Sequence, residues 1–441
     1  MVEAPKAPPA PPPPPAPPLP DAPEGVQLLE NPQWLTPAFE KLQQIEAGQD
    51  DLKVRFIHYG DSHIASDFWT GVVRRRLQER FGDAGHGFIL AGKPWKSYHH
   101  LDVDYGVGKR KDWSAERIRV YETGTDGRLG LGGVTIRSEK PGASVWVATE
   151  ADGPVGQNVG SFEVFYLKQP GGGRADLFLD GKKTGSIDTR GQAHMPGYHT
   201  VNAEDGPHRL DLRVRGNGDV RLFGFALERP RSGVVYDSVG INGARHTVPL
   251  QWDLAIWKAH IAHRRPDVLV TTYGSNEVGD AMNYAAYAQK VGRMIRIYRK
   301  AVPNGACLII GPPDQARKLT RAQLKDPAFA QAKARAAAQR DKDAWETPAQ
   351  LEKIRQALRQ AAADNRCAFW DSSAAIGGPG TMDLWARSKP PKAYKDRVHM
   401  TRDSYEAVAN QLHDAFIHAY ECHKVQPFKA PSNAPAPDNA P

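Results

Sequence analysis

The feature that most constrains the fold is a series of short apolar runs that alternate with amphipathic stretches. The runs are rich in Val, Ile and aromatic residues and lie at 54–59, 234–239, 268–273, 306–311 and 367–371. Helical periodicity is found near 249–263, 284–301 and 349–364. Strands that alternate with helices usually pair in parallel, since each helix returns the chain to the same edge of the sheet. The pattern predicts an α/β fold with a doubly wound parallel sheet.

A different pattern occupies the long segment between the first two runs. From about residue 93 to 231 the helical period disappears, and short alternating runs are separated by Gly, Pro, Asp and Asn turns. This pattern predicts an all-β sandwich inserted into the α/β domain. The expected strands lie at 117–121, 133–137, 144–148, 162–167, 175–179, 208–215 and 220–227.

Both ends of the chain differ in composition from the rest. Residues 1–25 include the proline run 11–15, and we expect them to form a disordered, extended spacer. Residues 425–441 have few apolar side chains and are expected to form a disordered tail. The α/β domain would then comprise 26–92 and 232–424, with the sandwich at 93–231. No apolar run is long enough to span a membrane, and the first residues do not resemble a signal peptide.

The first apolar run is followed by the most informative motif, the segment Gly60-Asp61-Ser62-His63. Apolar residues recur at helical spacing from Trp69 to Phe81, and Gly82 follows as a stop. The segment therefore predicts a strand, a tight turn and a helix N-terminus, with Ser62 near backbone N–H groups that can stabilise an oxyanion. A serine in that place is a candidate nucleophile.

A serine hydroxyl attacks only when a neighbouring base accepts its proton. The best candidate base is His399 in the segment 396–399, just before a predicted helix at 401–420. In that position His399 can deprotonate Ser62, while Asp396 fixes its tautomer and stabilises the imidazolium. The alternative is an ordinary surface loop whose Thr401 caps the following helix.

The same Asp-x-x-His spacing occurs twice more, so spacing alone does not identify the pair. Asp83 and His86 follow the first helix in a Gly-flanked turn, and Asp205 and His208 lie in a turn of the β-rich segment. We expect both pairs to be solvated loop residues.

Two further turns follow predicted strands. Gly243 lies in the turn after the run at 234–239, and Asn276 lies in Gly274-Ser275-Asn276-Glu277 after the run at 268–273. The carboxyl ends of parallel strands face one crevice, so a Gly N–H and an Asn side-chain amide there can both donate to one oxyanion. Taken singly, each is equally well explained as a turn residue.

In this order, the four segments resemble the conserved blocks of the SGNH branch of the GDSL-type serine esterases. The resemblance implies that Ser62 is the nucleophile, that Asp396 and His399 complete a triad, and that Ser62, Gly243 and Asn276 form the oxyanion hole. Glu277 stands where the third block usually has Asp, and His63 where the first usually has Leu. These two departures, together with the inserted sandwich, are similar to the bacterial peptidoglycan O-acetylesterases.

That resemblance implies a serine esterase that removes O-acetyl groups from a cell-envelope polysaccharide, most suitably peptidoglycan, through an acetyl-enzyme and without a cofactor. It also implies a periplasmic or cell-envelope location, with an export signal already removed, and a carbohydrate-binding sandwich; a sandwich without a ligand stays open. Two alternatives for the whole protein also stay open. One is a polysaccharide O-acetyltransferase with the same triad, and the other is a noncatalytic wall-binding protein.

The sequence offers little support for a metal or disulfide site. Cys307, Cys367 and Cys422 are odd in number and lack metal-binding spacing, so we expect neither a disulfide framework nor a zinc site, and the first two to act as small apolar residues. His260 and His263 lie three apart without further ligands, which favours a polar helix face.

The net charge is +8, with a pI near 9.2. A positive field favours approach to anionic envelope polymers. Nucleic acid is a rival partner, but no basic run is interleaved with stacking aromatics, so we expect none. The Ala-, Lys- and Arg-rich stretch 317–345 favours an exposed helix by propensity, with its charge serving solvation.

Overall fold

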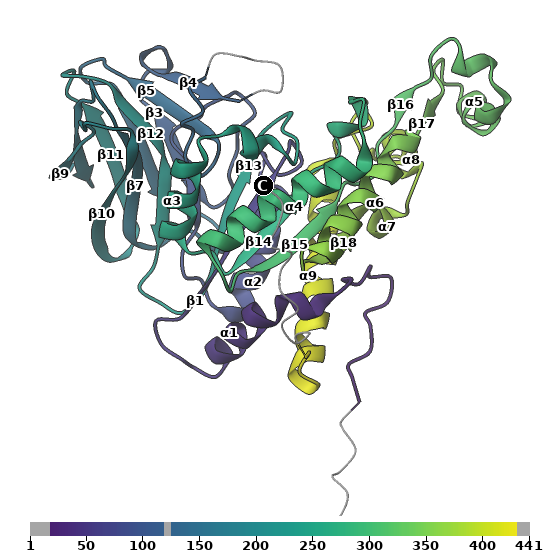
Figure 1. Ribbon diagram of the computed structural model, residues 1–441, viewed down its shortest axis with the longest axis horizontal. Coiled ribbons are helices and arrows are strands. Elements are labelled where there is room, and N and C mark those ends of the chain that lie inside the picture. The colour runs from purple at the N-terminus through teal and green to yellow at the C-terminus, as the bar shows by residue number, and fades with distance from the viewer. Residues whose placement is uncertain (1–17, 119–124, 430–441) are drawn as a thin grey trace, which may run out of the picture.

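The computed structural model describes residues 18–118 and 125–429. Residues 1–17 of the expected spacer, 430–441 of the expected tail and 119–121 of one expected strand lie outside this part of the chain. Figure 1 shows a β-rich lobe on one side, a central α/β lobe and a short arm on the other side. In the described part of the chain, no helix combines the length and the apolar character needed to cross a membrane.

The central sheet is parallel throughout and follows the predicted runs closely. Its strand order places the second strand of the α/β domain beside the first, although the whole insert separates them in sequence. From edge to edge the strands are β13 (Gly233–Gly240), β1 (Lys53–Gly60), β14 (Val268–Thr272), β15 (Ala306–Gly311) and β18 (Ala368–Asp371). The predicted doubly wound parallel sheet is confirmed.

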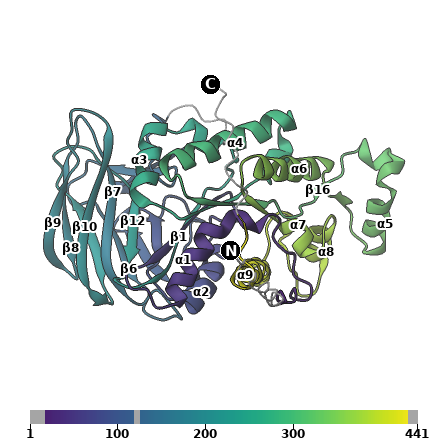
Figure 2. The same cartoon turned by 60° about the horizontal axis from the view of Figure 1, so that its bottom comes forward.

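Helices cover both faces of this sheet, as Figure 2 shows. Successive strand residues alternate between two cores, so that Phe56 packs on one face and Ile57 on the other. The face of Ile57 is covered by α3 (Leu254–Arg264), α4 (Tyr284–Ala301) and α6 (Ala349–Asp364). The face of Phe56 is covered by α1 (Thr36–Glu46), α2 (Thr70–Phe81) and α9 (Arg402–Val425), and the short helices α7 (Ser372–Ile376) and α8 (Thr381–Arg387) follow β18.

The insert forms two antiparallel sheets that share an apolar core, which confirms the predicted sandwich. One sheet has the order β10-β7-β12-β5-β4, with β2 paired to β12, and the other has the order β3-β6-β11-β8-β9. The strands are β2 (Gly87–Leu90), β3 (Val103–Val107), β4 (Ser114–Arg117), β5 (Val134–Ser138), β6 (Ser144–Thr149), β7 (Val159–Lys168), β8 (Arg174–Leu179), β9 (Lys182–Asp188), β10 (Met195–Gly206), β11 (Arg209–Val214) and β12 (Val220–Glu228).

Four of these strands, β2, β3, β9 and β10, were not expected from the sequence. The strands β3, β9 and β10 carry many polar or exposed residues, so their alternation of apolar side chains is weak. In addition, β2 belongs to the segment expected in the α/β domain, but it pairs with β12 of the sandwich. The sandwich sheet thus begins before residue 93.

The sandwich and the α/β domain are not separate bodies, because one core runs through both. Phe165 of β7 contacts Phe88 of β2 and the ring of His260 on α3, with ring centroids 5.2 and 5.6 Å apart. His260 is fully buried, and His263 stacks on Tyr198 at 3.6 Å. The prediction of a polar helix face is therefore wrong for His260, because the sandwich covers it, whereas His263 is exposed and its Nε2 lies 2.7 Å from Glu163 Oε1.

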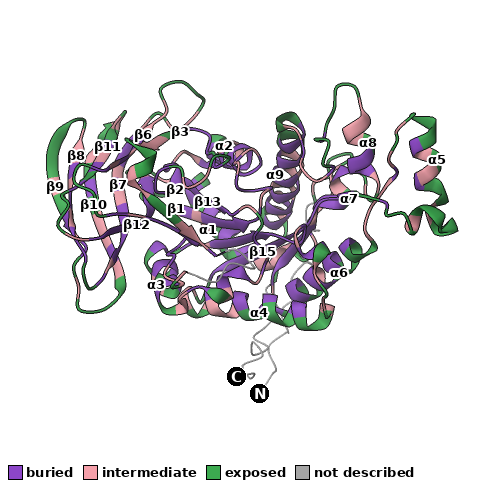
Figure 3. Ribbon diagram, turned by 90° about the horizontal axis from the view of Figure 1, so that it is seen from above, coloured by how far each residue is buried: buried purple, intermediate pink, exposed green. Residues whose placement is uncertain are grey.

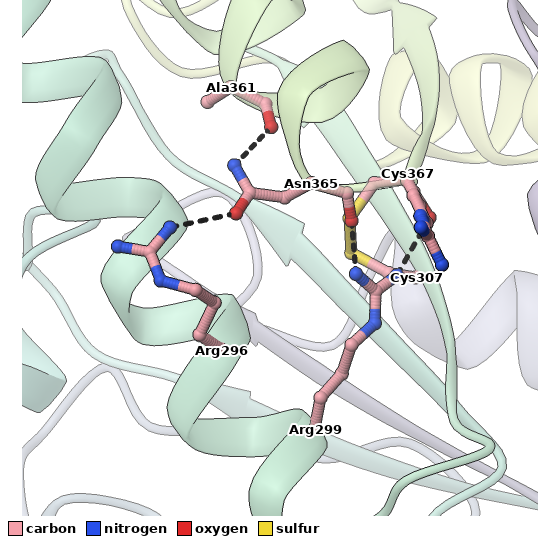
Figure 4. The surroundings of a disulfide bond; sticks show 7 residues. Arg296, Arg299, Cys307, Ala361, Asn365 and Cys367 are labelled. Atoms are coloured by element: carbon pink, nitrogen blue, oxygen red, sulfur yellow. Dashed lines mark hydrogen bonds between the residues drawn. A yellow bond between two sulfur atoms is a disulfide. The ribbon is translucent and has the colours of Figure 1, made fainter. Parts of the chain in front are cut away.

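The expectation of three unpaired cysteines is also wrong. Cys307 and Cys367 form a disulfide, with Cα atoms 4.6 Å apart, and Cys422 is free and buried. Each bonded cysteine lies one residue before a register pair, Leu308 with Ala368, of the adjacent strands β15 and β18. Figure 4 shows Arg299 and Asn365 beside the disulfide. The sequence separation of 60 residues concealed this pairing, since the order of strands in the sheet is needed to see it.

The stretch 317–345 is not one long helix. It begins with β16 (Arg317–Lys318), continues through two short 3-10 turns, η5 (Gln323–Lys325) and η6 (Pro327–Phe329), and α5 (Ala330–Ala338), and ends beside β17 (Trp345–Glu346), which pairs with β16. Pro327 interrupts helical hydrogen bonding and starts a new turn, which is capped by the Asp326 side chain. The exposure predicted for this segment is observed, and Figure 3 shows α5 largely exposed.

Candidate active site

Three loops with predicted functional residues meet at the carboxyl edge of the central sheet. Gly60 at the end of β1 is in register with Gly240 of β13 and with Thr272 of β14. The segments that contain Ser62, Gly243 and Asn276 therefore leave neighbouring strands at the same level. This is the edge at which open α/β sheets bind ligands.

Ser62 lies in a tight turn rather than at a helix N-terminus. The carbonyl oxygen of Asp61 accepts hydrogen bonds from the N–H groups of Ile64 and Ala65, at 3.2 and 3.1 Å. A Cβ atom on Gly60 would lie 2.2 Å from Ile64, so this turn requires glycine at that position. The following helix, α2, begins only at Thr70, and the predicted helix N-terminus at Ser62 is wrong.

His399 stands between the hydroxyl and a carboxylate. Its Nε2 is 2.8 Å from Ser62 Oγ, and its Nδ1 is 2.7 Å from Asp396 Oδ2. The other oxygen of Asp396 accepts the N–H groups of Val398 and His399, at 2.9 and 3.0 Å. The hydroxyl, imidazole and carboxylate are thus in hydrogen-bond contact in the order that proton transfer requires.

The loop with Asp396 and His399 is held by the residue between them. Arg397 has a φ of 56°, and its guanidinium carbon lies 3.9 Å from the ring centroid of Trp345. The same guanidinium forms ion pairs with Asp383 and Asp341, at 3.0 and 3.2 Å. This packing fixes a backbone conformation that is uncommon for arginine.

The local electrostatics suit a general base. The hydrogen bond with Asp396 raises the pKa of His399 above its usual value, against the opposing effect of burial. Burial alone would raise the pKa of Asp396, but the hydrogen bonds from the His399 ring and from backbone N–H groups hold it below its usual range. Asp396 is therefore ionised near neutral pH, where it can stabilise an imidazolium.

A second histidine supports the first. The His63 ring lies 5.5 Å from the His399 ring, centroid to centroid, and its Nδ1 is 2.9 Å from the Tyr405 hydroxyl. Burial lowers the pKa of His63 to about 3, so this ring is neutral and packs against His399 without competing for the proton.

Asn276 connects the three loops. Its side-chain amide donates to the carbonyl oxygen of Ala244 at 3.0 Å and approaches Asp61 Oδ2 at 3.5 Å. Gly243 is exposed with a φ of 80°, and its N–H and that of Ser62 donate to no other group of the described chain. These N–H groups are free to donate to a ligand.

Sequence reasoning noted Glu277 only as a departure from a family pattern, but the structure gives it a clear place. Its Oε1 accepts the His246 N–H at 2.8 Å and the Tyr287 hydroxyl at 2.9 Å, and burial raises its pKa. Glu277 thereby ties the loop after β13 to the loop after β14. The one sequence signal for this role was that Glu277 keeps a carboxylate where the third block usually has Asp.

The two competing Asp-x-x-His pairs are engaged elsewhere. Asp83 and Asp205 both form ion pairs with Arg229, at 2.9 and 2.7 Å. His86 is buried and lies 3.2 Å from His100, so the expectation of a solvated residue is wrong for it. In residues 18–118 and 125–429, no group of three or more His, Cys, Asp or Glu side chains could hold a metal ion.

Comparison with known proteins agrees with the resemblance seen in the sequence. Residues 214–407 match the model of the GDSL-like lipase/acylhydrolase family. Over these residues the chain is similar to this family. The match includes Gly243, Asn276, Asp396 and His399, whereas Ser62 precedes it. The insert separates the segment that contains Ser62 from the others, and the pairing of β1 with β13 brings them together again.

One solved structure shows the same fold. A peptidoglycan O-acetylesterase structure is 23% identical with a TM-score of 0.69, and the alignment covers 89% of this chain and 99% of that one. A family 2 carbohydrate esterase with a carbohydrate-binding domain from Corynascus thermopiles (Myceliophthora fergusii) is 14% identical over 69% and 99% of the two chains, with a TM-score of only 0.29. No curated protein sequence matched this chain.

Proposed function

We propose that this protein is a serine esterase that removes O-acetyl groups from a cell-envelope polysaccharide, most suitably peptidoglycan. The observation that supports it most directly is the contact of His399 with both Ser62 and Asp396, at 2.8 and 2.7 Å. In our proposal these three residues are the catalytic triad.

The first step would form an acetyl-enzyme. Ser62 Oγ attacks the acetyl carbonyl carbon while its proton passes to Nε2 of His399. The N–H groups of Ser62 and Gly243 and the Asn276 amide donate to the resulting oxyanion, where removal of one donor typically costs about 10² to 10³ in turnover. The sugar oxygen leaves with the proton from His399, and Ser62 keeps the acetyl group.

The second step would hydrolyse the acetyl-enzyme and regenerate the free enzyme. A water molecule gives its proton to His399 and attacks the acetyl carbonyl carbon. The tetrahedral intermediate collapses, the Ser62–acyl bond breaks, and His399 returns the proton to Ser62 Oγ as acetate leaves. These steps use only side chains, backbone N–H groups and water, so the mechanism requires no cofactor.

Three features support an extracytoplasmic polymer as substrate. The fold and the inserted sandwich are shared with a peptidoglycan O-acetylesterase. The disulfide between Cys307 and Cys367 is typical of oxidising compartments such as the periplasm. The net charge of +8 favours an anionic partner. We further propose that the sandwich binds glycan and that the Pro-rich segment 1–25 is a spacer.

The test is acetate release from O-acetylated peptidoglycan, run beside acetylated xylan and a small chromogenic acetate ester. Wild type should release acetate, Ser62→Ala should lose nearly all turnover, and Ser66→Ala in the same turn should retain it. Transfer of acetyl to an added sugar acceptor in preference to water would instead identify a transferase. Binding of peptidoglycan without turnover of any ester would contradict the esterase proposal.

A further inference from the structure

The segment 316–347 forms an arm that projects from the α/β domain beyond α6 and α8 (Figure 1). It has only a small apolar core of its own, formed by Leu319, Ala332, Ala336 and Ala344 with Phe329 packed against it. Ordering a residue costs about 1–2 kcal/mol of backbone entropy, so this core adds little to the stability of the hydrolase. The arm therefore calls for a role other than stabilisation.

Both ends of the arm are attached to loops of the catalytic site. Immediately before its first residue, the Gln315 side chain donates to the carbonyl oxygen of Ser275, next to Asn276, at 3.2 Å. Near its end, Trp345 and Asp341 hold Arg397, which lies between Asp396 and His399. The arm consequently starts and ends beside the residues proposed to react with the substrate.

The arm is also strongly basic. It contains eight Lys and Arg residues against four Asp and Glu residues, a net charge of +4 within a chain of net charge +8. All four acids are engaged: Asp341 binds Arg387 and Arg397, Asp343 binds Lys318, Glu346 binds Arg335, and Asp326 caps the turn at Ala328.

Five basic side chains of the arm remain exposed, and none forms an ion pair with another described residue. They are Arg317, Arg321, Lys325, Arg340 and Lys342. The charge of the arm is thus directed to solvent rather than neutralised within the fold.

Arg317 marks the inner end of this basic surface. A Cβ atom built on Gly279 would lie 3.6 Å from a terminal nitrogen of Arg317. Gly279 ends the 3-10 turn η4 (Glu277–Gly279), which directly follows Asn276. A guanidinium at this place presents a planar set of donors suited to a carboxylate near the oxyanion loop.

We propose that the arm, residues 316–347, is a docking surface for an anionic, carboxylate-bearing stretch of the polymer substrate, with Arg317 binding a carboxylate close to the ester. This inference rests on the proposed function and specifies its substrate class. Peptidoglycan meets the requirement because its peptides carry carboxylates, whereas acetylated xylan provides a mainly neutral polymer for comparison.

Two arm variants test the proposal against two matched controls. The arm variants are Arg317→Gln and the triple variant R321Q/K325Q/K342Q. The controls are Arg293→Gln, an exposed arginine on α4, and the triple variant K258Q/K290Q/K300Q, which removes the same charge from exposed positions outside both the arm and the sandwich. Each is assayed for kcat/KM on peptidoglycan and on the small chromogenic ester, at low and high salt.

We expect the ratio of peptidoglycan to small-ester kcat/KM to fall roughly 3- to 10-fold in the arm variants and to stay near wild type in the controls. The remaining peptidoglycan activity should depend less on salt, because fewer charges are left to be screened. An unchanged ratio in both arm variants, or an equal loss in the control triple variant, would overturn the proposal.

A binding measurement tests the role of the arm independently of the proposed esterase activity. Cosedimentation of Ser62→Ala with insoluble peptidoglycan, with and without the arm substitutions, measures docking without turnover. If wild type hydrolyses the small ester but not peptidoglycan, the proposed function fails while cosedimentation still tests the arm. Equal cosedimentation with and without the arm charges, or tighter binding of duplex DNA than of peptidoglycan, would refute a carboxylate-binding arm.

Discussion

At the scale of single residues, the proposed mechanism makes the reactivity of Ser62 depend on the protonation of His399. The imidazole accepts a proton only in its neutral form, so kcat/KM should fall as the pH drops below the pKa of His399. The hydrogen bond with Asp396 raises that pKa, and the fall should therefore be centred above the usual value of about 6.5. A pH profile of kcat/KM on the small ester measures this directly.

Substitution of Asp396 separates its two effects on His399. Asp396→Asn should lower kcat roughly 10⁴-fold because the wrong tautomer is favoured, and it should move the acidic limb to lower pH because the partner charge is lost. Asp403→Asn, an exposed acid in the first turn of α9, is the control and should change neither value. An acidic limb that stays in place in Asp396→Asn would contradict this account of His399.

At the scale of elements, Glu277 fastens the two loops that bear the proposed oxyanion donors. Glu277→Ala would leave the buried Tyr287 hydroxyl and the His246 N–H without their acceptor. We expect kcat to fall roughly 10- to 100-fold with little change in KM, since a small displacement of donors affects the transition state most. Glu277→Gln should restore most of kcat, because burial already favours a neutral group there. Equal losses in both variants would contradict this positioning role.

The disulfide joins the elements β15 and β18. In the chain-entropy model, a link that closes a loop of this length stabilises the fold by about 4 kcal/mol. The double variant Cys307→Ala/Cys367→Ala should thus unfold at a lower temperature than wild type, and reductant should lower the Tm of wild type but not of the variant. Cys422→Ala is the control, because Cys422 is unpaired. A Tm of wild type that does not respond to reductant would be inconsistent with this contribution.

Most elements near the catalytic edge could be predicted from sequence because their patterns are local. The strands that precede Ser62, Gly243 and Asn276 are apolar runs ended by Gly-containing turns, and both properties are visible within ten residues. The Cys307–Cys367 pair and the burial of His260 could not be predicted, since both depend on which distant elements become neighbours. The strands β9 and β10 were not predicted for a different reason. Their exposed residues weaken the alternation of apolar and polar side chains on which strand prediction depends.

At the scale of the whole molecule, the apolar core shared by the two lobes predicts that they unfold together. Phe165→Ala removes a ring that contacts Phe88, Tyr198 and His260, and should cost about 3–5 kcal/mol. The calorimetric transition and the thermal loss of esterase activity should both move to lower temperature.

Phe162→Ala provides the matched comparison, because Phe162 is buried within the sandwich core alone. If the lobes are cooperative, this variant should also lower the temperature at which esterase activity is lost. Activity that persists after the sandwich has unfolded would show that the two lobes are independent.

The chain leaves the α/β domain at Gly82 and returns at Gly233, and these two glycines touch: the Val234 N–H donates to the Gly82 carbonyl oxygen at 2.9 Å. A short linker could therefore reconnect the chain with the sandwich excised. Such a minimal enzyme would, however, expose His260 on α3 to water, because its ring packs against Phe165, Tyr198 and Phe223 of the sandwich. Anyone who wishes to produce the catalytic lobe alone should first redesign that helix face with polar side chains, or the truncated protein will aggregate.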